Sequence, residues 1–359
     1  MATPAARATA LVAVLALVVA CGGPTTTAAP LTATATAPTS PRASASPGTA
    51  RSPSAPASRA PASPDGPITA GSWDGGAPMP TSRIEQSAAA IDGVIYVAGG
   101  IDDSGNSLAT FEALDTATGA WTALPPLPEA RDHFGFAALD GRLYLSGGEL
   151  LSQGAIRQGL WVFDPATNAW GALAQMPEPR SQHGMAATGG RLWVTGGVVP
   201  GSNSRALWAY DPATGSWETD LPDMPTQRNH LSVVEARGLV YAIGGRTDEL
   251  GNLGAAEAYD PAANSWESLA AMPTARGGMV IGAIGARIHT AGGEDLDANR
   301  TYPDHEVYDT GTGTWSTAPD LPTPRHGIAG AVVDGRWYVI GGGRQARLST
   351  SDVVEVFTP

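Results

Sequence analysis

Residues 88–100 read AAAIDGVIYVAGG, and the glycine pair that ends them, Gly99-Gly100, returns five more times along the chain. The later pairs begin at residues 147, 196, 244, 292 and 341, so the steps are 48, 49, 48, 48 and 49 residues. A repeat of this length is one supersecondary unit that buries its apolar face only by stacking against its neighbours. The array therefore predicts a single repeat-built domain within the 359 residues.

Each unit carries the marks of four short strands. Before the glycine pair, two apolar runs are separated by turn residues, and Asp92-Gly93 is a strong hairpin dipeptide. After the pair, an aromatic residue or leucine stands seven residues before a tryptophan in five units, for example at Tyr210 and Trp217. The turn between these two, DPATGS, is rich in residues that close tight turns. Four-stranded sheets repeated radially make a β-propeller, here with six blades.

These marks, together with a Met-Pro-x-x-Arg link between units, resemble the kelch repeat, whose period is about 50 residues. The resemblance spans residues 68–359 and implies an all-β fold, a six-bladed kelch-type β-propeller. Kelch propellers include binding modules and enzymes, so the resemblance leaves the function open. Copper radical oxidases of this type need a tyrosine crosslinked to a cysteine, and they are excluded because no cysteine follows Cys21.

The last unit lacks its fourth strand, which the N-terminal end of the array supplies. The unit reaches Phe357 without the expected tryptophan, while residues 68–73, ITAGSW, match the last strand of the other units. We predict that this N-terminal strand pairs beside residues 352–357 and closes the last blade. An open propeller would instead leave a long unpaired strand edge.

The N-terminus predicts export. Residues 11–20 are apolar but too few to span a bilayer as a mature helix, which indicates a signal peptide over residues 1–20. The run Val18-Val19-Ala20-Cys21 resembles the lipobox of bacterial lipoproteins, which implies lipidation of Cys21; an ordinary cleaved signal is the alternative. Residues 21–67, rich in Ala, Pro, Ser and Thr, are typical of a disordered linker. The predicted location is the extracytoplasmic face of the cell membrane, at the bacterial cell surface.

The charge of the chain limits its partners. Acidic residues outnumber basic ones by 34 to 21, every basic residue is arginine, and the net charge is −13. Nucleic acids and anionic lipid surfaces reward clustered positive charge, so we predict neither as a partner beyond the lipid anchor. We also predict a monomer without a cofactor.

Six arginines occupy one equivalent position after the link between units, and they are spaced like the glycine pairs. They are Arg83, Arg131, Arg180, Arg228, Arg276 and Arg325. In a propeller this link leads into the innermost strand, so all six are expected near the central channel at one mouth. Their expected partners recur as well, at Glu112, Glu257, Glu306 and Glu355. One interpretation is an arginine–carboxylate network that ties neighbouring blades together. The other is a bidentate clamp for an anionic ligand.

Two tryptophans and four histidines complete the candidates. Trp161 and Trp208 replace the glutamate in the second and third units, either as a platform for a sugar or peptide or as packing between blades. His133, His183, His230 and His326 follow the arginines by two, three, two and one residues. Because these offsets do not place them at one equivalent position, we predict structural hydrogen bonding and no metal site.

The functional prediction is an exported, membrane-tethered binding protein that presents one propeller mouth to a protein or glycan. The predicted ligand-binding residues are the six arginines with Trp161 and Trp208, and no catalytic residue is assigned. The alternative is a kelch-type sugar epimerase or mutarotase that acts on a sugar acid held by the arginine ring.

Overall fold

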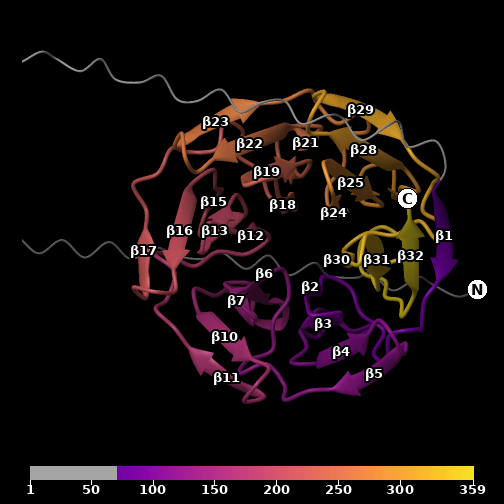
Figure 1. Cartoon of the computed structure of the whole chain (residues 1–359), viewed down its shortest axis with the longest axis horizontal. Coiled ribbons are helices and arrows are strands. Elements are labelled where there is room, and N and C mark those ends of the chain that lie inside the picture. Colours follow the sequence, from indigo (N-terminus) through magenta and orange to yellow (C-terminus); the bar gives the residue numbers. More distant parts are fainter. Residues whose placement is uncertain (1–70) are drawn as a thin grey trace, which may run out of the picture. The chain divides into compact units, whose positions relative to one another are not determined.

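The structure is a computed structural model that describes residues 71–359. Six four-stranded antiparallel sheets follow one another around a central axis (Figure 1), which confirms the predicted propeller. The predicted signal peptide, the lipidation site at Cys21 and the linker lie outside the described residues. Within residues 71–359, no helix is long and apolar enough to cross a bilayer.

In each blade the first strand lies nearest the axis and the fourth lies at the rim (Figure 1). Blades 1 to 3 are β2 (Ser87–Ile91), β3 (Val94–Ala98), β4 (Phe111–Asp115), β5 (Ala120–Ala123); β6 (Gly135–Leu139), β7 (Arg142–Ser146), β10 (Leu160–Asp164), β11 (Ala169–Ala172); and β12 (Gly184–Thr188), β13 (Arg191–Thr195), β16 (Leu207–Asp211), β17 (Ser216–Glu218). Blades 4 to 6 are β18 (Ser232–Ala236), β19 (Leu239–Ile243), β22 (Ala256–Asp260), β23 (Ser265–Ser268); β24 (Val280–Ile284), β25 (Arg287–Ala291), β28 (His305–Asp309), β29 (Thr314–Thr317); and β30 (Ala329–Val333), β31 (Arg336–Ile340), β32 (Val354–Thr358), β1 (Ser72–Gly75).

Short two-stranded ribbons extend the loop between the second and third strands in blades 2 to 5. They are β8 (Glu149–Leu150) with β9 (Ala155–Ile156), β14 (Val198–Val199) with β15 (Ser202–Asn203), β20 (Arg246–Thr247) with β21 (Gly251–Asn252), and β26 (Glu294–Asp295) with β27 (Arg300–Thr301). One 3-10 turn, η1 (Leu151–Gln153), lies in the first of these loops. These loops are the least repetitive connections, where a rigid scaffold commonly carries its binding residues.

The N-terminal strand closes the last blade, as predicted. Strand β1 pairs antiparallel with β32, and Trp73 stands opposite Phe357. The same pairing of an aromatic residue or leucine with a tryptophan recurs in the other blades, as between Tyr210 and Trp217. The indole N–H of Trp73 also donates to the carbonyl of Pro319 at 2.8 Å, in the link that leaves blade 5. The ring is thus joined by both sheet pairing and a bond to the preceding blade.

The glycine pairs mark close backbone contacts between blades. In the second pair, Gly147 and Gly148 have φ values of 60° and 89°, a conformation that favours glycine. The N–H of Gly148 donates to the carbonyl of Arg180 at 2.9 Å. A Cβ added to Gly147 would lie 2.2 Å from that same carbonyl oxygen. The pairs are therefore required where the neighbouring backbone leaves no room for a side chain.

The size of the core side chains depends on how close each strand lies to the propeller axis. The innermost strands carry mainly small side chains, such as SAAAI in β2 and GFAAL in β6, because six of them converge on the axis. The second strands, such as VIYVA in β3, are buried on both faces and fill the space between blades with larger side chains. The buried arginines of the repeat lie outside this apolar core, in the links just before the innermost strands.

Candidate functional site

The six arginines at the equivalent position are buried, with at most 3% of their surface exposed. In four blades the guanidinium meets a buried glutamate of the third strand. These pairs are Arg83 with Glu112, Arg228 with Glu257, Arg276 with Glu306, and Arg325 with Glu355. Arg228 donates to Glu257 at 2.7 Å and to the carbonyls of Gly244 and Ala242 at 2.7 and 2.9 Å. Burial lowers the pKa of Arg228, and Glu257 opposes that shift.

Blades 2 and 3 lack that glutamate, and their buried arginines have other partners. Arg131 pairs with Glu129 at 2.8 Å, two residues earlier in the chain. The guanidinium of Arg180 stacks 3.6 Å from the ring centroid of Trp208, and burial lowers the pKa of Arg180 to about 10. Trp161 and Trp208 pack into two different apolar clusters. As ligand contacts these residues stay a prediction, and their observed contacts are those expected of a structural network.

A second set of six residues, each two positions after an arginine, surrounds the channel and forms what we call the axial ring. Its members are Glu85, His133, Gln182, His230, Gly278 and Gly327. All six have left-handed backbone φ values between 48° and 65°. Each N–H donates to the carbonyl of the ring member in the preceding blade over 2.7 to 3.3 Å, so the hydrogen bonds close on themselves.

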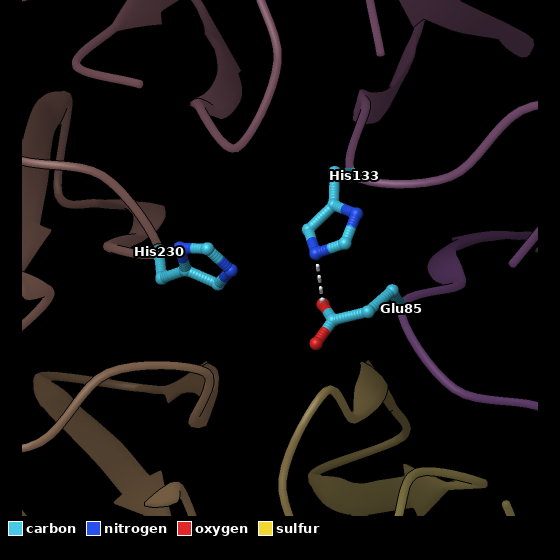
Figure 2. Close-up of side chains that lie close together, drawn as sticks. All are labelled: Glu85, His133 and His230. Carbon is cyan, nitrogen blue, oxygen red and sulfur yellow. Dashed lines mark ion pairs between the residues drawn. The ribbon is translucent and has the colours of Figure 1, made fainter. Parts of the chain in front are cut away.

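The left-handed backbone gives the axial ring its functional interest. Residues other than glycine seldom adopt positive φ, and such strain is concentrated at functional sites. Three of the ring side chains, from Glu85, His133 and His230, point toward one another in the channel (Figure 2). All six ring members line an axial cavity of about 400 Å³.

The distances within this cluster are short. His133 Nε2 lies 3.4 Å from Glu85 Oε2. The rings of His133 and His230 meet edge to face, with centroids 5.1 Å apart. Three blades therefore contribute one polar side chain each to a single point near the axis.

Hydrogen bonds behind the two histidines set their orientation. His133 Nδ1 lies 2.6 Å from Asp132 Oδ1 and 3.2 Å from Glu149 Oε1, while His230 Nδ1 lies 2.6 Å from Asn229 Oδ1. Carboxylate and amide oxygens only accept hydrogen bonds, so both rings donate through Nδ1–H. Each histidine consequently presents Nε2 toward the channel.

The surroundings shift the pKa values of the two histidines in opposite directions. Burial alone would lower the pKa of His133, but Glu85 and Asp132 raise it well above its ordinary value. Burial lowers the pKa of His230 well below its ordinary value, with help from the positive charge of Arg246.

The four histidines do not all share one equivalent position, but two of them do. His133 and His230 do share one equivalent position and converge, because both belong to the axial ring. His183 lies one residue further on and bonds to Ser146 Oγ at 2.9 Å inside the core. His326 lies one residue earlier and faces Glu294 at 3.2 Å. These two histidines contact other residues of the fold and do not belong to the axial ring.

Comparisons with known proteins agree with this architecture. Residues 71–219 match the family model described as KLHDC2/KLHL20/DRC7 Kelch-repeats domain, and residues 227–273 match the Kelch motif. The chain belongs to the kelch-repeat β-propeller family. A solved structure titled "Structure of YjhT" resembles this kelch propeller with a TM-score of 0.68 at 20% identity, over 79% of this chain and 96% of that one. No curated protein matches the chain.

A groove opens beside the axial ring of this kelch propeller, between the loops of blades 3 and 4. It has a volume of about 780 Å³ and shares Gln182 with the axial cavity. Its lining is rich in amides and hydroxyls, including Ser202, Asn203 and Thr247. Leu250 at its rim is 66% exposed, although it is a large apolar side chain.

Arg246, which lies outside the repeated set of arginines, is already paired near the axial ring. Arg246 NH1 contacts Glu294 Oε1 at 2.6 Å, and the side chain of Arg246 is 16% exposed. The other oxygen of Glu294 accepts from the backbone N–H of Arg347 at 2.9 Å and faces His326. Arg246 is thus held by a carboxylate rather than directed toward an incoming anion.

A pH effect is expected from two buried histidines in blade 5 of the kelch propeller. His289 Nδ1 lies 2.9 Å from His305 Nε2, and burial lowers their pKa values to about 3 and about 4. In the unfolded chain both bind a proton below about pH 6.5, while the folded protein keeps them neutral until about pH 4. The free energy of unfolding should therefore fall as the pH drops from 6.5 toward 4, by about 1.4 kcal/mol per pH unit for each histidine.

Urea unfolding at pH 7.5, 6 and 5 measures this slope. The matched variant His289→Tyr with His305→Leu uses residues found at the equivalent positions of other blades, at Tyr96 and Leu160. Its stability should depend less on pH than that of the natural protein. Parallel curves for the two proteins would contradict the assignment.

Proposed function

We propose that this kelch propeller is an exported binding protein, tethered to the membrane through a lipid on Cys21, that holds a glycan at one mouth. The mouth consists of the axial ring and the groove between the loops of blades 3 and 4. One observation carries the proposal: a backbone position repeated six times bears Glu85, His133, Gln182 and His230 in four consecutive blades. Repetition supplies the scaffold there, and the unlike side chains supply a directional set of polar contacts.

The chemistry of the mouth favours a glycan over an anionic ligand. The amides of Gln182 and Asn203 and the hydroxyls of Ser202 and Thr247 combine donors with acceptors, as sugar hydroxyls require. The six repeated arginines are buried, so none of them offers an exposed clamp for a carboxylate. The epimerase or mutarotase alternative relied on such a clamp and is therefore the weaker candidate. A protein ligand is the other candidate, and Leu250 at the rim offers it an exposed apolar contact.

We also infer that the protein acts as a monomer on the extracytoplasmic face. Its net charge of −13 supports the exclusion of nucleic acids and of direct contact with anionic lipid surfaces. The lipid on Cys21 would then be its sole attachment to the membrane.

A glycan array probed with the purified protein tests the proposal. Binding should fall roughly tenfold in Gln182→Ala and in Asn203→Ala, because each removes a side chain that would bond to the glycan. The matched control is Gln158→Ala, a glutamine that bonds to Gln175 in blade 2, and it should bind like the natural protein.

Two other outcomes would overturn the glycan proposal. One is the absence of any bound glycan together with stable capture of a protein at the mouth. The other is turnover of a free aldose or sialic acid, followed by NMR, which would favour the epimerase or mutarotase alternative.

A further inference from the structure

We propose that Glu85, His133 and His230 form a binding site for a divalent transition metal ion, such as Zn²⁺, on the axis of the propeller. Two imidazoles and one carboxylate are a ligand set that proteins use for such ions. The site goes beyond the proposed function and does not depend on a glycan.

The spacing of the ligand atoms supports a metal site. Each residue offers one ligand atom, and the three atoms lie within 4.8 Å of one another. Two ligands bound tetrahedrally to zinc at 2.0 to 2.1 Å stand about 3.3 Å apart. Glu85 Oε2 and His133 Nε2 are separated by 3.4 Å, so this edge of the coordination sphere is already formed. The ligand atom of His230 lies within 4.8 Å of the other two and would have to approach them to complete the set.

The hydrogen bonds behind the histidines match those of known metal sites. Metal-binding histidines almost always donate their other ring N–H to a carboxylate or carbonyl, which fixes the tautomer and the ring orientation. His133 donates in this way to Asp132 and Glu149, and His230 donates to the amide oxygen of Asn229. Both Nε2 atoms are thus left facing the channel.

A second group of possible ligands, Asp132, His133 and Glu149, shares His133 with the first. Asp132 is fully buried, and its second oxygen accepts a hydrogen bond from Ser107. A metal bound by this group would coordinate His133 Nδ1 and so break the hydrogen bonds by which Asp132 and Glu149 orient the imidazole ring. The two carboxylates are therefore better suited to orient His133 than to bind the ion.

The two glycines of the axial ring leave part of the ion's surroundings free of side chains. Gly278 and Gly327 follow His230 in the ring, so two consecutive blades present only backbone there. A Cβ at Gly327 would lie 2.6 Å from Glu85 Oε1, so glycine makes room for the carboxylate. A bound ion would keep open coordination positions toward the cavity for water or for an oxygen atom of a ligand.

Titration of the chelator-treated full protein with Zn²⁺ by calorimetry, and with Co²⁺ by visible absorption, tests the site. One equivalent of each ion should bind. His230→Ala and Glu85→Gln should each weaken Zn²⁺ binding by at least roughly 100-fold. Asn229→Ala should weaken it roughly 10- to 100-fold, as expected for a residue that positions a ligand.

The control variant is His326→Gln. His326 is an imidazole one residue before Gly327, the axial-ring member of blade 6, so the variant protein should keep the Zn²⁺ affinity of the natural protein. Circular dichroism of every variant verifies the fold, and Glu85→Gln preserves the size of the side chain. Absence of a one-equivalent site in the natural protein would overturn the proposal. Unchanged binding by the folded double variant Glu85→Gln with His230→Ala would also overturn it. Neither result would alter the outcome of the glycan array.

Discussion

Deleting β1, residues 72–75, is expected to leave a chain that is mostly unfolded or aggregated at room temperature. The deletion exposes the whole edge of β32 and removes the indole of Trp73 from its contacts with Trp337 and Phe357. Loss of a partly buried tryptophan side chain alone costs about 3 kcal/mol. Because folded proteins are stable by only about 5 to 15 kcal/mol, losing the strand as well should remove most of that stability. Chemical unfolding and light scattering measure the two effects.

Point variants separate the contribution of Trp73 from that of the strand. Trp73→Ala keeps the backbone pairing with β32 but loses the aromatic contacts and the bond to the Pro319 carbonyl. We expect the free energy of unfolding to fall by about 3 kcal/mol. Asp74→Ala, on the same strand with an exposed side chain, should change it by less than about 0.5 kcal/mol. Equal effects of the two variants would argue against Trp73 as the residue that fastens the ring.

The propeller could be predicted because its repeated positions make the same physical demand in every blade. Gly147 must leave room for the Arg180 carbonyl, and each of the other glycine pairs meets an equivalent contact. A demand of this kind restricts the residue type, so it appears as a repeat in the sequence. The closing strand was found in the same way, since Trp73 makes the contact that a tryptophan makes in every other blade.

The axial ring could not be predicted in this way, because its members share a backbone conformation and not a chemistry. Glu85, His133, Gln182 and His230 occupy one position with four polar side chains of three types. Left-handed φ cannot be inferred from residues that seldom adopt it. One signal was present: Gly278 and Gly327 stand at the same offset from their arginines as His133 and His230. Glycine at two of six equivalent positions indicates positive φ and would have aligned the histidines.

The arginines were located by sequence, but their role depends on burial, which the spacing alone does not decide. The recurring glutamates correctly identified the partners of Arg83 and Arg228. In blade 2 the partner of Arg131 is Glu129, and Glu178 stands at the same offset in blade 3, 3.7 Å from Arg180. Neither glutamate was identified as a partner, because the other four units have threonine at this position.

Glu257→Gln is expected to lower the free energy of unfolding by about 3 to 5 kcal/mol. The substitution keeps the size of the side chain but removes the negative charge beside Arg228, which is fully buried. Removing one partner of a buried ion pair leaves the other charge uncompensated in a medium of low polarity, and losses of this size are typical. Chemical unfolding of the variant and the natural protein at neutral pH measures the difference.

The surface pair between Arg191 and Glu218 provides the control, since both side chains are more than one third exposed. Water already screens these charges, so Glu218→Gln should cost less than about 1 kcal/mol. An equally small loss in Glu257→Gln would mean that the carbonyls of Gly244 and Ala242 are enough to stabilise the buried guanidinium. The environment of Arg180 supports the larger loss of unfolding free energy that we expect for Glu257→Gln. Without a buried glutamate it stacks on Trp208, and its pKa falls to about 10. In blade 4, Glu257 occupies the position equivalent to Trp208. Its carboxylate contacts the buried guanidinium of Arg228, as the Trp208 ring contacts that of Arg180.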